Sequence, residues 1–342
     1  MIFLMNFNYL IFISLLILSI LIGMNSMSLI FLWISIEVNM MSFVPMILFM
    51  KNFYNNCSIK YFLIQGFSSS LMLFFMLNLY YMNLVLLMIM MLILVMMIKL
   101  GYFPFHYWYL DLLKKLDWVS GGMLMSVQKI LPFFFLNYLF NLMLFSNLLK
   151  INYIMNNFYL ILILMCLMIM MLMYSNNSIK LFMGLSSMNH MSWMMLLMIL
   201  DFELWSMYYM YYIQILINLV LIMNKFNILN FNHFYLINNN MYKYIIFILI
   251  FLLMMLPPMI GFFLKIYSIE LFVNSNMMFL VYLFLNLSIF MSYYYMNLFM
   301  SSLLFMNMNL FINLNYWIQW KKIDLMLFYT NLLMFLFYWM IS

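Results

Sequence analysis

Apolar runs of membrane-spanning length follow one another along almost the whole chain, and no other feature limits the possible folds as strongly. A helix of about 20 residues crosses the roughly 30 Å of hydrocarbon in a bilayer. Of the 342 residues, 70% are hydrophobic and only 6% are charged. A soluble chain could not cover its surface with so few polar groups. The sequence therefore predicts an all-α polytopic membrane protein.

The hydropathy pattern predicts about eleven transmembrane helices and no polar domain between them. We expect these spans at about 2–22, 27–50, 59–81, 84–110, 119–146, 153–174, 179–200, 204–224, 243–271, 277–300 and 324–341. The segment 301–323, where asparagines alternate with apolar residues, is expected to be an interfacial helix. Residues 1–342 then form a single transmembrane domain.

The amino-acid usage indicates where the gene resides. The chain has 48 methionines, no alanine, no arginine and one threonine, Thr330. Residues with GC-rich codons are nearly absent, and the methionine excess fits a genome that reads ATA as methionine. This pattern indicates a mitochondrial gene and an inner-membrane protein. The first segment, 1–22, lacks the basic region and cleavage site of a signal peptide, so we expect it to be the first span.

The loop charges predict an orientation. Threading eleven spans places most lysines on or next to one face: Lys51, Lys60, Lys114, Lys115, Lys180, Lys225, Lys243, Lys321 and Lys322. The other face receives Lys150, together with Asp201, Glu203 and Glu270. The positive-inside rule assigns the lysine-rich face to the matrix, so the N-terminus is expected there.

Two predicted spans are longer than a crossing requires and are interrupted by helix-breaking residues. The span 84–110 is broken around Gly101 and Pro104, and the span 243–271 is broken at Pro257–Pro258 and Gly261. Proline removes a backbone donor and frees carbonyl groups within the membrane. A pair of discontinuous helices in the two halves of a chain is a pointer to an ion site.

Three lysines and one carboxylate are expected within the membrane rather than in loops. Lys99 and Lys265 adjoin the two breaks, Lys129 lies mid-span, and Glu37 is the acid at comparable depth. Charged side chains are costly in hydrocarbon and usually mark ion or proton pathways. A carboxylate that approaches and leaves Lys99 would change how tightly this lysine holds its proton, and our hypothesis is that Glu37 lies near Lys99 and provides this switch.

Other readings of these charges remain open. Lys99 and Lys265 could extend to the interface by snorkelling, whereas Lys129, roughly ten residues from either end of its span, is poorly placed to do this. Glu37 could instead be a static, hydrogen-bonded acid that joins helices.

The histidines differ in their surroundings. His190 lies mid-span beside serines and an asparagine, where a proton relay and a packing role compete evenly. His106 could line the first broken helix or only cap it, and the capping role is favoured. His233 is expected to be solvated in a polar loop.

The same residues exclude several kinds of chemistry. No predicted helix carries the paired histidines of a membrane cytochrome. No phosphate loop, dinucleotide fingerprint or cysteine cluster is present, so we expect no cofactor in this chain. The lysines are scattered and form no basic patch, so nucleic acid is not an expected partner.

Several motifs in order resemble the antiporter-like subunits in the membrane arm of respiratory complex I, the NADH:ubiquinone oxidoreductase of mitochondria. The matching segments are Trp33–Asn39, Lys99–Gly101 with Pro104–Trp108, Gln128–Ile130 with Pro132, Ser186–Met191, and Leu256–Pro258 with Gly261, Phe262 and Lys265. They cover roughly residues 30 to 270, and the chain length favours the shorter of these subunits. Tyr102 and Phe103 crowd a region where small residues are usual, and Ser192 stands where glycine is expected.

The resemblance implies a fold and a function. The fold would be antiporter-like inverted repeats, with a first bundle at about 1–150, a second at about 151–300, each with one discontinuous helix, and a C-terminal part at 301–342. A hydrophilic proton relay would pass through Glu37, Lys99, Lys129 and Lys265, with His190 and Lys180 near it. Redox chemistry would belong to other subunits, and the partners would be neighbouring membrane-arm subunits and lipids. A free-standing cation/proton antiporter and a non-conducting scaffold are the alternatives.

Overall fold

The fold is known from a computed structural model, and within its described residues the regular structure is α-helical. The described residues are 2–26, 28–49, 56–81, 85–145, 151–174, 178–230, 240–255, 259–275 and 277–309. One isolated β-bridge joins Ser178 and Asn230. The all-α prediction is confirmed.

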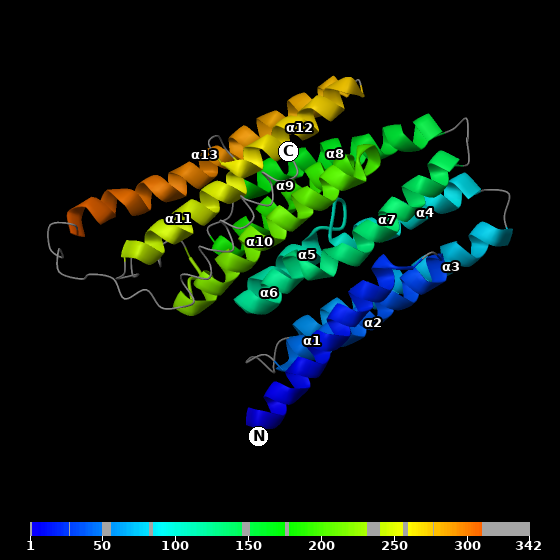
Figure 1. The fold of residues 1–342 in the computed structure, drawn as a ribbon, viewed down its shortest axis with the longest axis horizontal. Coiled ribbons are helices and arrows are strands. Elements are labelled where there is room, and N and C mark those ends of the chain that lie inside the picture. Colours follow the sequence, from blue (N-terminus) through cyan, green and yellow to red (C-terminus); the bar gives the residue numbers. More distant parts are fainter. Residues whose placement is uncertain are drawn as a thin grey trace. The chain divides into compact units, whose positions relative to one another are not determined.

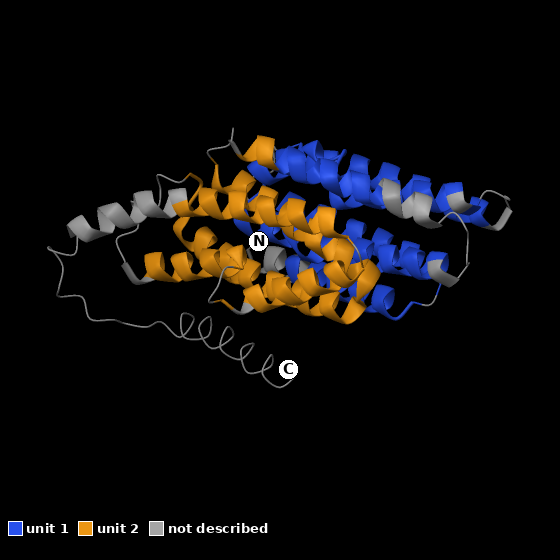
Figure 2. Cartoon of the chain, turned by 90° about the horizontal axis from the view of Figure 1, so that it is seen from above, with its two compact units in different colours: residues 1–169 blue, residues 170–342 orange. Residues whose placement is uncertain are grey.

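The chain forms two compact units, residues 1–169 and residues 170–342, which Figure 2 shows in blue and orange. The boundary between them lies within helix α8 (Ile151–Tyr174). Each unit has its own broken helix and, among the described residues, buried lysines: Lys99 and Lys129 in unit 1 and Lys265 in unit 2.

In unit 1, helix α7 is packed among several neighbours. The unit comprises α1 (Ile2–Met24), α2 (Leu29–Phe49), α3 (Cys57–Tyr81), α4 (Val85–Leu100), α5 (Tyr107–Lys115), α6 (Trp118–Met125), α7 (Val127–Phe145) and most of α8. Helices α1, α2 and α3 pack side by side, and α3 packs on α4 (Figure 1). Helix α7 contacts α1, α2 and α4, so a residue near its start is surrounded by protein rather than lipid.

In unit 2, helix α9 is buried on every side. The unit comprises α9 (Ile179–Leu200), α10 (Phe202–Phe226), α11 (Asn240–Met254), α12 (Ile260–Asn274) and α13 (Met278–Asn309). Helix α9 contacts α10, α12 and α13, and all of its residues from 181 to 198 are buried. Its middle is polar, with Ser186, Ser187, Asn189, His190 and Ser192.

The helices have the length and surface of membrane spans. Five helical segments are long and apolar enough to cross a bilayer, the third of which comprises α6 and most of α7: Leu29–Phe49, Cys57–Leu79, Trp118–Met143, Phe202–Phe226 and Met278–Met296. Shorter apolar helices accompany them. Large apolar side chains face outward, Met171 being 75% and Phe279 67% exposed, which suits contact with lipid. The chain is a multi-pass membrane protein.

The predicted number of spans remains a prediction. The last predicted span, 324–341, lies outside the described residues, as do residues 310–323 of the predicted interfacial segment. Residues 301–309 belong to α13.

The predicted span 119–146 corresponds to the candidate membrane span Trp118–Met143, within which the structure shows two helices rather than one. Helix α6 ends at Met125 and α7 begins at Val127. The amide and hydroxyl of Ser126 both donate to the Gly122 carbonyl, and the Lys129 amide donates to the Ser126 carbonyl at 2.9 Å. Pro132 lies inside α7 and cannot donate to the carbonyl of Gln128, four residues before it.

Candidate functional site: buried cations at the helix breaks

The first break, between α4 and α5, begins with a glycine in a left-handed conformation. Gly101 has φ +66°, and its amide donates to the Ile98 carbonyl at 3.1 Å. The Tyr102 amide donates to the Met97 carbonyl at 2.9 Å. These two bonds form a Schellman motif, in which glycine is favoured because it has no Cβ. The predicted discontinuity around Gly101 and Pro104 is confirmed.

Neutral side chains satisfy the carbonyl groups at the end of α4. Trp108 Nε1 on α5 donates to the Ile98 carbonyl at 3.1 Å, and Gln65 Nε2 on α3 donates to the Lys99 carbonyl at 3.2 Å. The last turn of a helix leaves carbonyls without intrahelical donors, so such partners stabilise a helix end within the membrane.

Lys99 lies in this last turn and is buried, with a side chain only 5% exposed. Its Nζ has no hydrogen-bond partner within the described part of the chain. Glu37 on α2, which is half-buried, acts electrostatically on Lys99, although the two side chains do not form an ion pair. The charges are therefore near each other but not in direct contact. A cation at this position also faces the negative end of the α4 dipole.

Lys129 lies near the start of α7 and is 2% exposed. Its Nζ donates to the hydroxyl of Tyr109 on α5 at 3.0 Å and lies 4.6 Å from the centre of that ring. The adjacent Gln128 accepts a hydrogen bond from the hydroxyl of Tyr61 on α3 at 2.9 Å. The start of α7 is thus held by two tyrosines from different helices.

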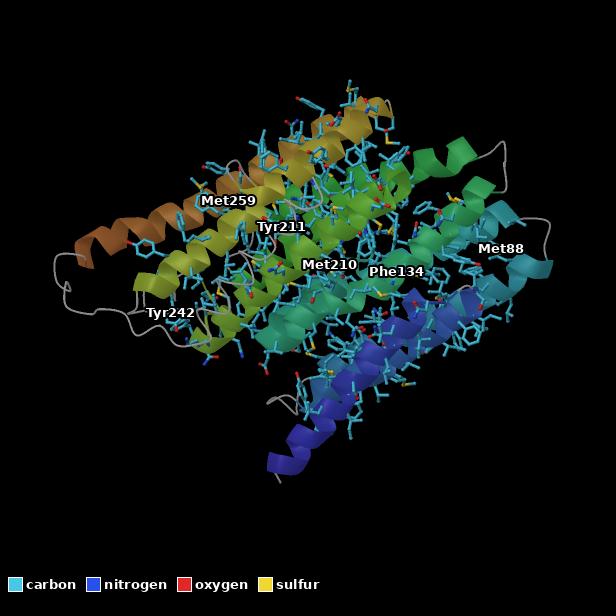
Figure 3. The ribbon with its side chains drawn as sticks, viewed as in Figure 1. Met88, Phe134, Met210, Tyr211, Tyr242 and Met259 are labelled. Atoms are coloured by element: carbon cyan, nitrogen blue, oxygen red, sulfur yellow. The ribbon has the colours of Figure 1, made fainter. Side chains whose placement is uncertain are left out.

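The second break, between α11 and α12, is built differently. Met255 has φ 52°, which is unfavourable for a residue with a side chain. Tyr211 of α10 donates to the Leu252 carbonyl at 3.2 Å, and Figure 3 labels Tyr211 together with Met259, the residue before α12. Residues 256–258, which include the predicted prolines of the break, lie outside the described residues.

Lys265 of α12 reaches back across this break. Its Nζ donates to the Met254 carbonyl at 2.9 Å and lies 5.9 Å from the ring centre of Trp193 on α9. The side chain is 7% exposed, so it does not extend to the surface of the chain. Lys265 therefore places its charge at the C-terminal end of α11, where a cation is stabilised by the helix dipole.

His190 on α9 is buried and contacts two tyrosines of α10. Its Nδ1 lies 2.9 Å from the Tyr208 hydroxyl, and its ring centre lies 5.3 Å from that of Tyr212. Tyr208 and Tyr211 are three residues apart and lie on neighbouring positions of the same helix face. One face of α10 thus carries hydroxyls to both His190 and the second break.

Of the other two histidines, His106 and His233, only His106 lies within the part of the chain that the structure describes, and it does not pair with a tyrosine hydroxyl there as His190 does. His106 is buried at the start of α5, and neither ring nitrogen has a hydrogen-bond partner within the described residues. Its ring centre lies 4.2 Å from that of Tyr107. His233 lies outside the described residues. Among the described side chains, no three His, Cys, Asp or Glu residues gather as metal ligands would.

The structure gathers the predicted residues into two groups. Glu37, Lys99 and Lys129 belong to unit 1, whereas His190 and Lys265 belong to unit 2. Lys180 is a half-buried residue in the first turn of α9. A single relay through all of these residues remains a prediction.

Sequence reasoning missed the hydroxyl partners, Tyr109 and Tyr208. Tyrosine is abundant here, with 27 in the chain, so a single tyrosine carries little signal. The one sequence pattern that could have indicated a hydroxyl partner is the spacing of Tyr208, Tyr211 and Tyr212, which lie on one helix face.

Comparisons with known proteins agree with this architecture. Residues 26–292 match the family described as NADH:quinone oxidoreductase/Mrp antiporter, transmembrane. NADH-ubiquinone oxidoreductase chain 2 of Anopheles gambiae is 32% identical over 283 residues, covering 79% of each chain. The protein of the same name from Aedes aegypti is 31% identical over 293 residues, covering 83% of this chain and 82% of the relative.

Solved structures share the fold at low sequence identity. A chain of respiratory complex I from Thermus thermophilus has a TM-score of 0.75 and 15% identity, covering 85% of this chain and 70% of that one. A chain of the Mrp complex from Dietzia has a TM-score of 0.72 and 10% identity, covering 84% and 59%. The fold is therefore the antiporter-like one. With most of its length matched by the family and relatives above 30% identity, the chain belongs to the NADH:quinone oxidoreductase/Mrp antiporter family of transmembrane proteins.

Proposed function

We propose that this chain is a core membrane-arm subunit of mitochondrial respiratory complex I, equivalent to chain 2, and that it takes part in proton translocation. NADH oxidation and ubiquinone reduction would take place in other subunits and drive it. The relatives named NADH-ubiquinone oxidoreductase chain 2 support the assignment. The proposed partners are neighbouring membrane-arm subunits and lipids.

The burial of Lys129 among helices is the observation that carries this proposal. The lysine is 2% exposed and lies at the start of α7, the helix that packs on α1, α2 and α4. Burying a cation in such a place is costly, and charged side chains within a membrane usually mark ion or proton pathways. A scaffold would have no use for it, because an apolar side chain of similar size would pack without the cost of burying charge.

The proposed relay comprises Glu37, Lys99, Lys129, Lys265 and His190, with Glu37 as the modulator of Lys99 and the other four as proton carriers. In unit 1, approach of the Glu37 carboxylate would favour the protonated form of Lys99, and its withdrawal would favour proton release. The separated arrangement of the two groups, in electrostatic range but without an ion pair, fits such a switch. In unit 2, the pair of His190 and Tyr208 offers a second place where a proton can be held.

We further propose that the protein resides in the mitochondrial inner membrane with its N-terminus in the matrix. The lysine bias of the predicted loops supports this orientation. Protease protection of a tag at the N-terminus in intact mitoplasts tests it, because cleavage from the intermembrane-space side would contradict the proposal.

Lys129→Met in the assembled complex tests the function. Methionine keeps the side-chain volume and removes the charge. We expect native gels to show the complex assembled, and reconstituted vesicles to lose proton pumping by about a hundredfold or more, as for loss of an acid–base group. Lys60→Met is the matched control, because Lys60 is 48% exposed and should pump as the unaltered complex does. Full pumping by assembled Lys129→Met would contradict the proposal and favour a scaffold.

A free-standing cation/proton antiporter is the second candidate, since a chain of the Mrp complex has the same fold. Native gels separate the two functions. Migration of this chain with NADH dehydrogenase activity supports the complex I subunit, and migration apart from it supports the antiporter.

A further inference from the structure

Tyr109 connects the first helix break to Lys129. Its hydroxyl accepts a hydrogen bond from Lys129 Nζ at 3.0 Å, and its side chain is 1% exposed. Tyr109 belongs to α5, the half-helix that follows the break, whereas Lys129 belongs to α7. The contact thus depends on where the break places α5.

The backbone of the break determines where the Tyr109 ring can lie. A Cβ atom added to Gly101 would lie 2.6 Å from Tyr109 Cβ and 3.0 Å from its Cγ. The ring therefore packs directly on the glycine, at a distance that only a residue without a side chain permits. Trp108 fixes the same segment, because its Nε1 donates to the Ile98 carbonyl at 3.1 Å. The position of the Tyr109 hydroxyl is set by rigid contacts and not by a flexible side chain.

A phenolic hydroxyl suits a lysine that changes its protonation state. It can accept a hydrogen bond from the ammonium form and donate one to the neutral amine. A backbone carbonyl, the partner of Lys265, can only accept. Tyr109 can therefore keep Lys129 in one place in both protonation states.

We propose that Tyr109 is the positioning residue for Lys129. It holds the lysine nitrogen at one location through both protonation states, and the break at Gly101 fixes the location. This inference rests on the proposed role of Lys129 in proton translocation. It adds Tyr109 of α5 to the residues that support this role. It also means that the first break positions a side chain, in addition to interrupting the helix.

The test compares two tyrosine hydroxyls that contact adjacent residues of α7. Tyr109→Phe removes the hydroxyl at Lys129, and Tyr61→Phe removes the hydroxyl at Gln128. We expect Tyr109→Phe to lower the turnover number for coupled NADH:ubiquinone reduction and proton pumping by about tenfold, as a misplaced reacting group would. The KM for ubiquinone should be unchanged. Tyr61→Phe should alter both rates by less than about twofold, because one neutral hydrogen bond contributes little.

A second pair keeps the test decisive if the phenylalanine variant does not assemble. Tyr109→Gln supplies a group that both donates and accepts, whereas Tyr109→Leu has similar size and does neither. We expect assembled Tyr109→Gln to pump at least about threefold faster than Tyr109→Leu. Equal rates for Gln and Leu, or equal rates for Tyr109→Phe and Tyr61→Phe, overturn the inference.

The failure of this inference differs from failure of the proposed function. If Lys129→Met abolishes pumping while Tyr109→Phe pumps normally, Lys129 carries protons without help from Tyr109 and only the inference fails. If Lys129→Met pumps normally, the proposed function itself fails.

Discussion

Both helix breaks leave backbone carbonyls without intrahelical donors, and the two breaks supply the missing donors in different ways. At the first, a glycine takes the left-handed conformation, and the neutral side chains of Trp108 and Gln65 satisfy the carbonyls at the end of α4. At the second, Met255 takes that conformation, and the Met254 carbonyl accepts its hydrogen bond from Lys265 itself. One break leaves its lysine free of hydrogen bonds within the described residues, and the other uses its lysine as part of the backbone structure.

Because of this difference, the lysine at the first break contributes only its charge among the described residues, whereas the lysine at the second break contributes both its charge and a hydrogen bond to the backbone. Removing Lys99 should disturb only the electrostatics of the first break, because no described hydrogen bond is lost. Removing Lys265 should disturb both the charge and the end of α11. The comparison therefore teaches that two similarly placed lysines in one membrane protein need not be equivalent, even where the sequence presents them as a pair.

The largest contrast is expected between Lys265→Met and Lys99→Met. Both should lower proton pumping by about a hundredfold or more if both lysines carry protons. Only Lys265→Met should also destabilise the assembled complex, by about 1–3 kcal/mol, because it leaves the Met254 carbonyl without its donor. Thermal inactivation followed on native gels measures this difference. Equal heat stability of the two variants would show that the breaks are alike.

The second-largest contrast is expected in the stability of the protein when the glycine of each break is replaced by alanine. Gly101→Ala should destabilise the protein by about 2–4 kcal/mol, since it combines a left-handed alanine with a Cβ clash against Tyr109. Gly261→Ala should cost about 1–3 kcal/mol, because its Cβ would lie 2.6 Å from Met255 Cγ and 2.7 Å from Cε1 of the buried Tyr211 ring, but it adds no left-handed strain. The loss of intact complex on heating ranks the two, and a larger loss for Gly261→Ala contradicts this account.

A smaller effect is expected when Glu37 loses its charge. Glu37→Gln should lower turnover by about threefold, less than the loss of Lys99, because the carboxylate modulates the lysine from a distance and carries no proton itself in this scheme. Glu270→Gln is the control, since Glu270 is an exposed carboxylate of unit 2. If Glu37→Gln and Lys99→Met both fail to assemble, the acid holds helices together instead.

The smallest effect is expected at the surface of unit 1. Lys60 and Asp111 form an ion pair at 3.6 Å, but their side chains are 48% and 53% exposed. Asp111→Asn should change the stability of the complex by less than about 0.5 kcal/mol and leave pumping unaltered. A measurable loss of pumping would mean that the position of α5, which carries both Asp111 and Tyr109, depends on this pair.

The sequence was most informative about features that are energetically costly in hydrocarbon, namely irregular backbone and charged side chains. Helical class, the two discontinuities and the burial of Lys99, Lys129 and Lys265 could be predicted, because the apolar setting makes irregular backbone and charges conspicuous. The interruption at Ser126 could not, because serine is compatible with a continuous helix and Pro132 alone does not locate the break. A proline frees the carbonyl of the preceding turn, but the exact place of the irregularity depends on tertiary packing.

The partners of the cations were not predictable for a different reason. Tyr109 of α5 meets Lys129 of α7 across the first break, and Lys265 meets Met254 because its side chain reaches from α12 back to the end of α11. These contacts join residues on separate helices, so the periodicity of a single helix cannot predict them. The composition made them harder to identify, since aromatic residues make up 21% of the chain.

The polar middle of α9 has a consequence for how the protein is made. Its serines, Asn189 and His190 lower its affinity for lipid, and it is not among the five helices apolar enough to span a bilayer by composition. A segment of this kind gains little by entering lipid alone. Helix α10 follows after Asp201 and supplies the Tyr208 hydroxyl to His190. Insertion of α9 is thus expected to be cooperative with α10, so that biogenesis would depend on this buried pair as well as the proposed proton transfer.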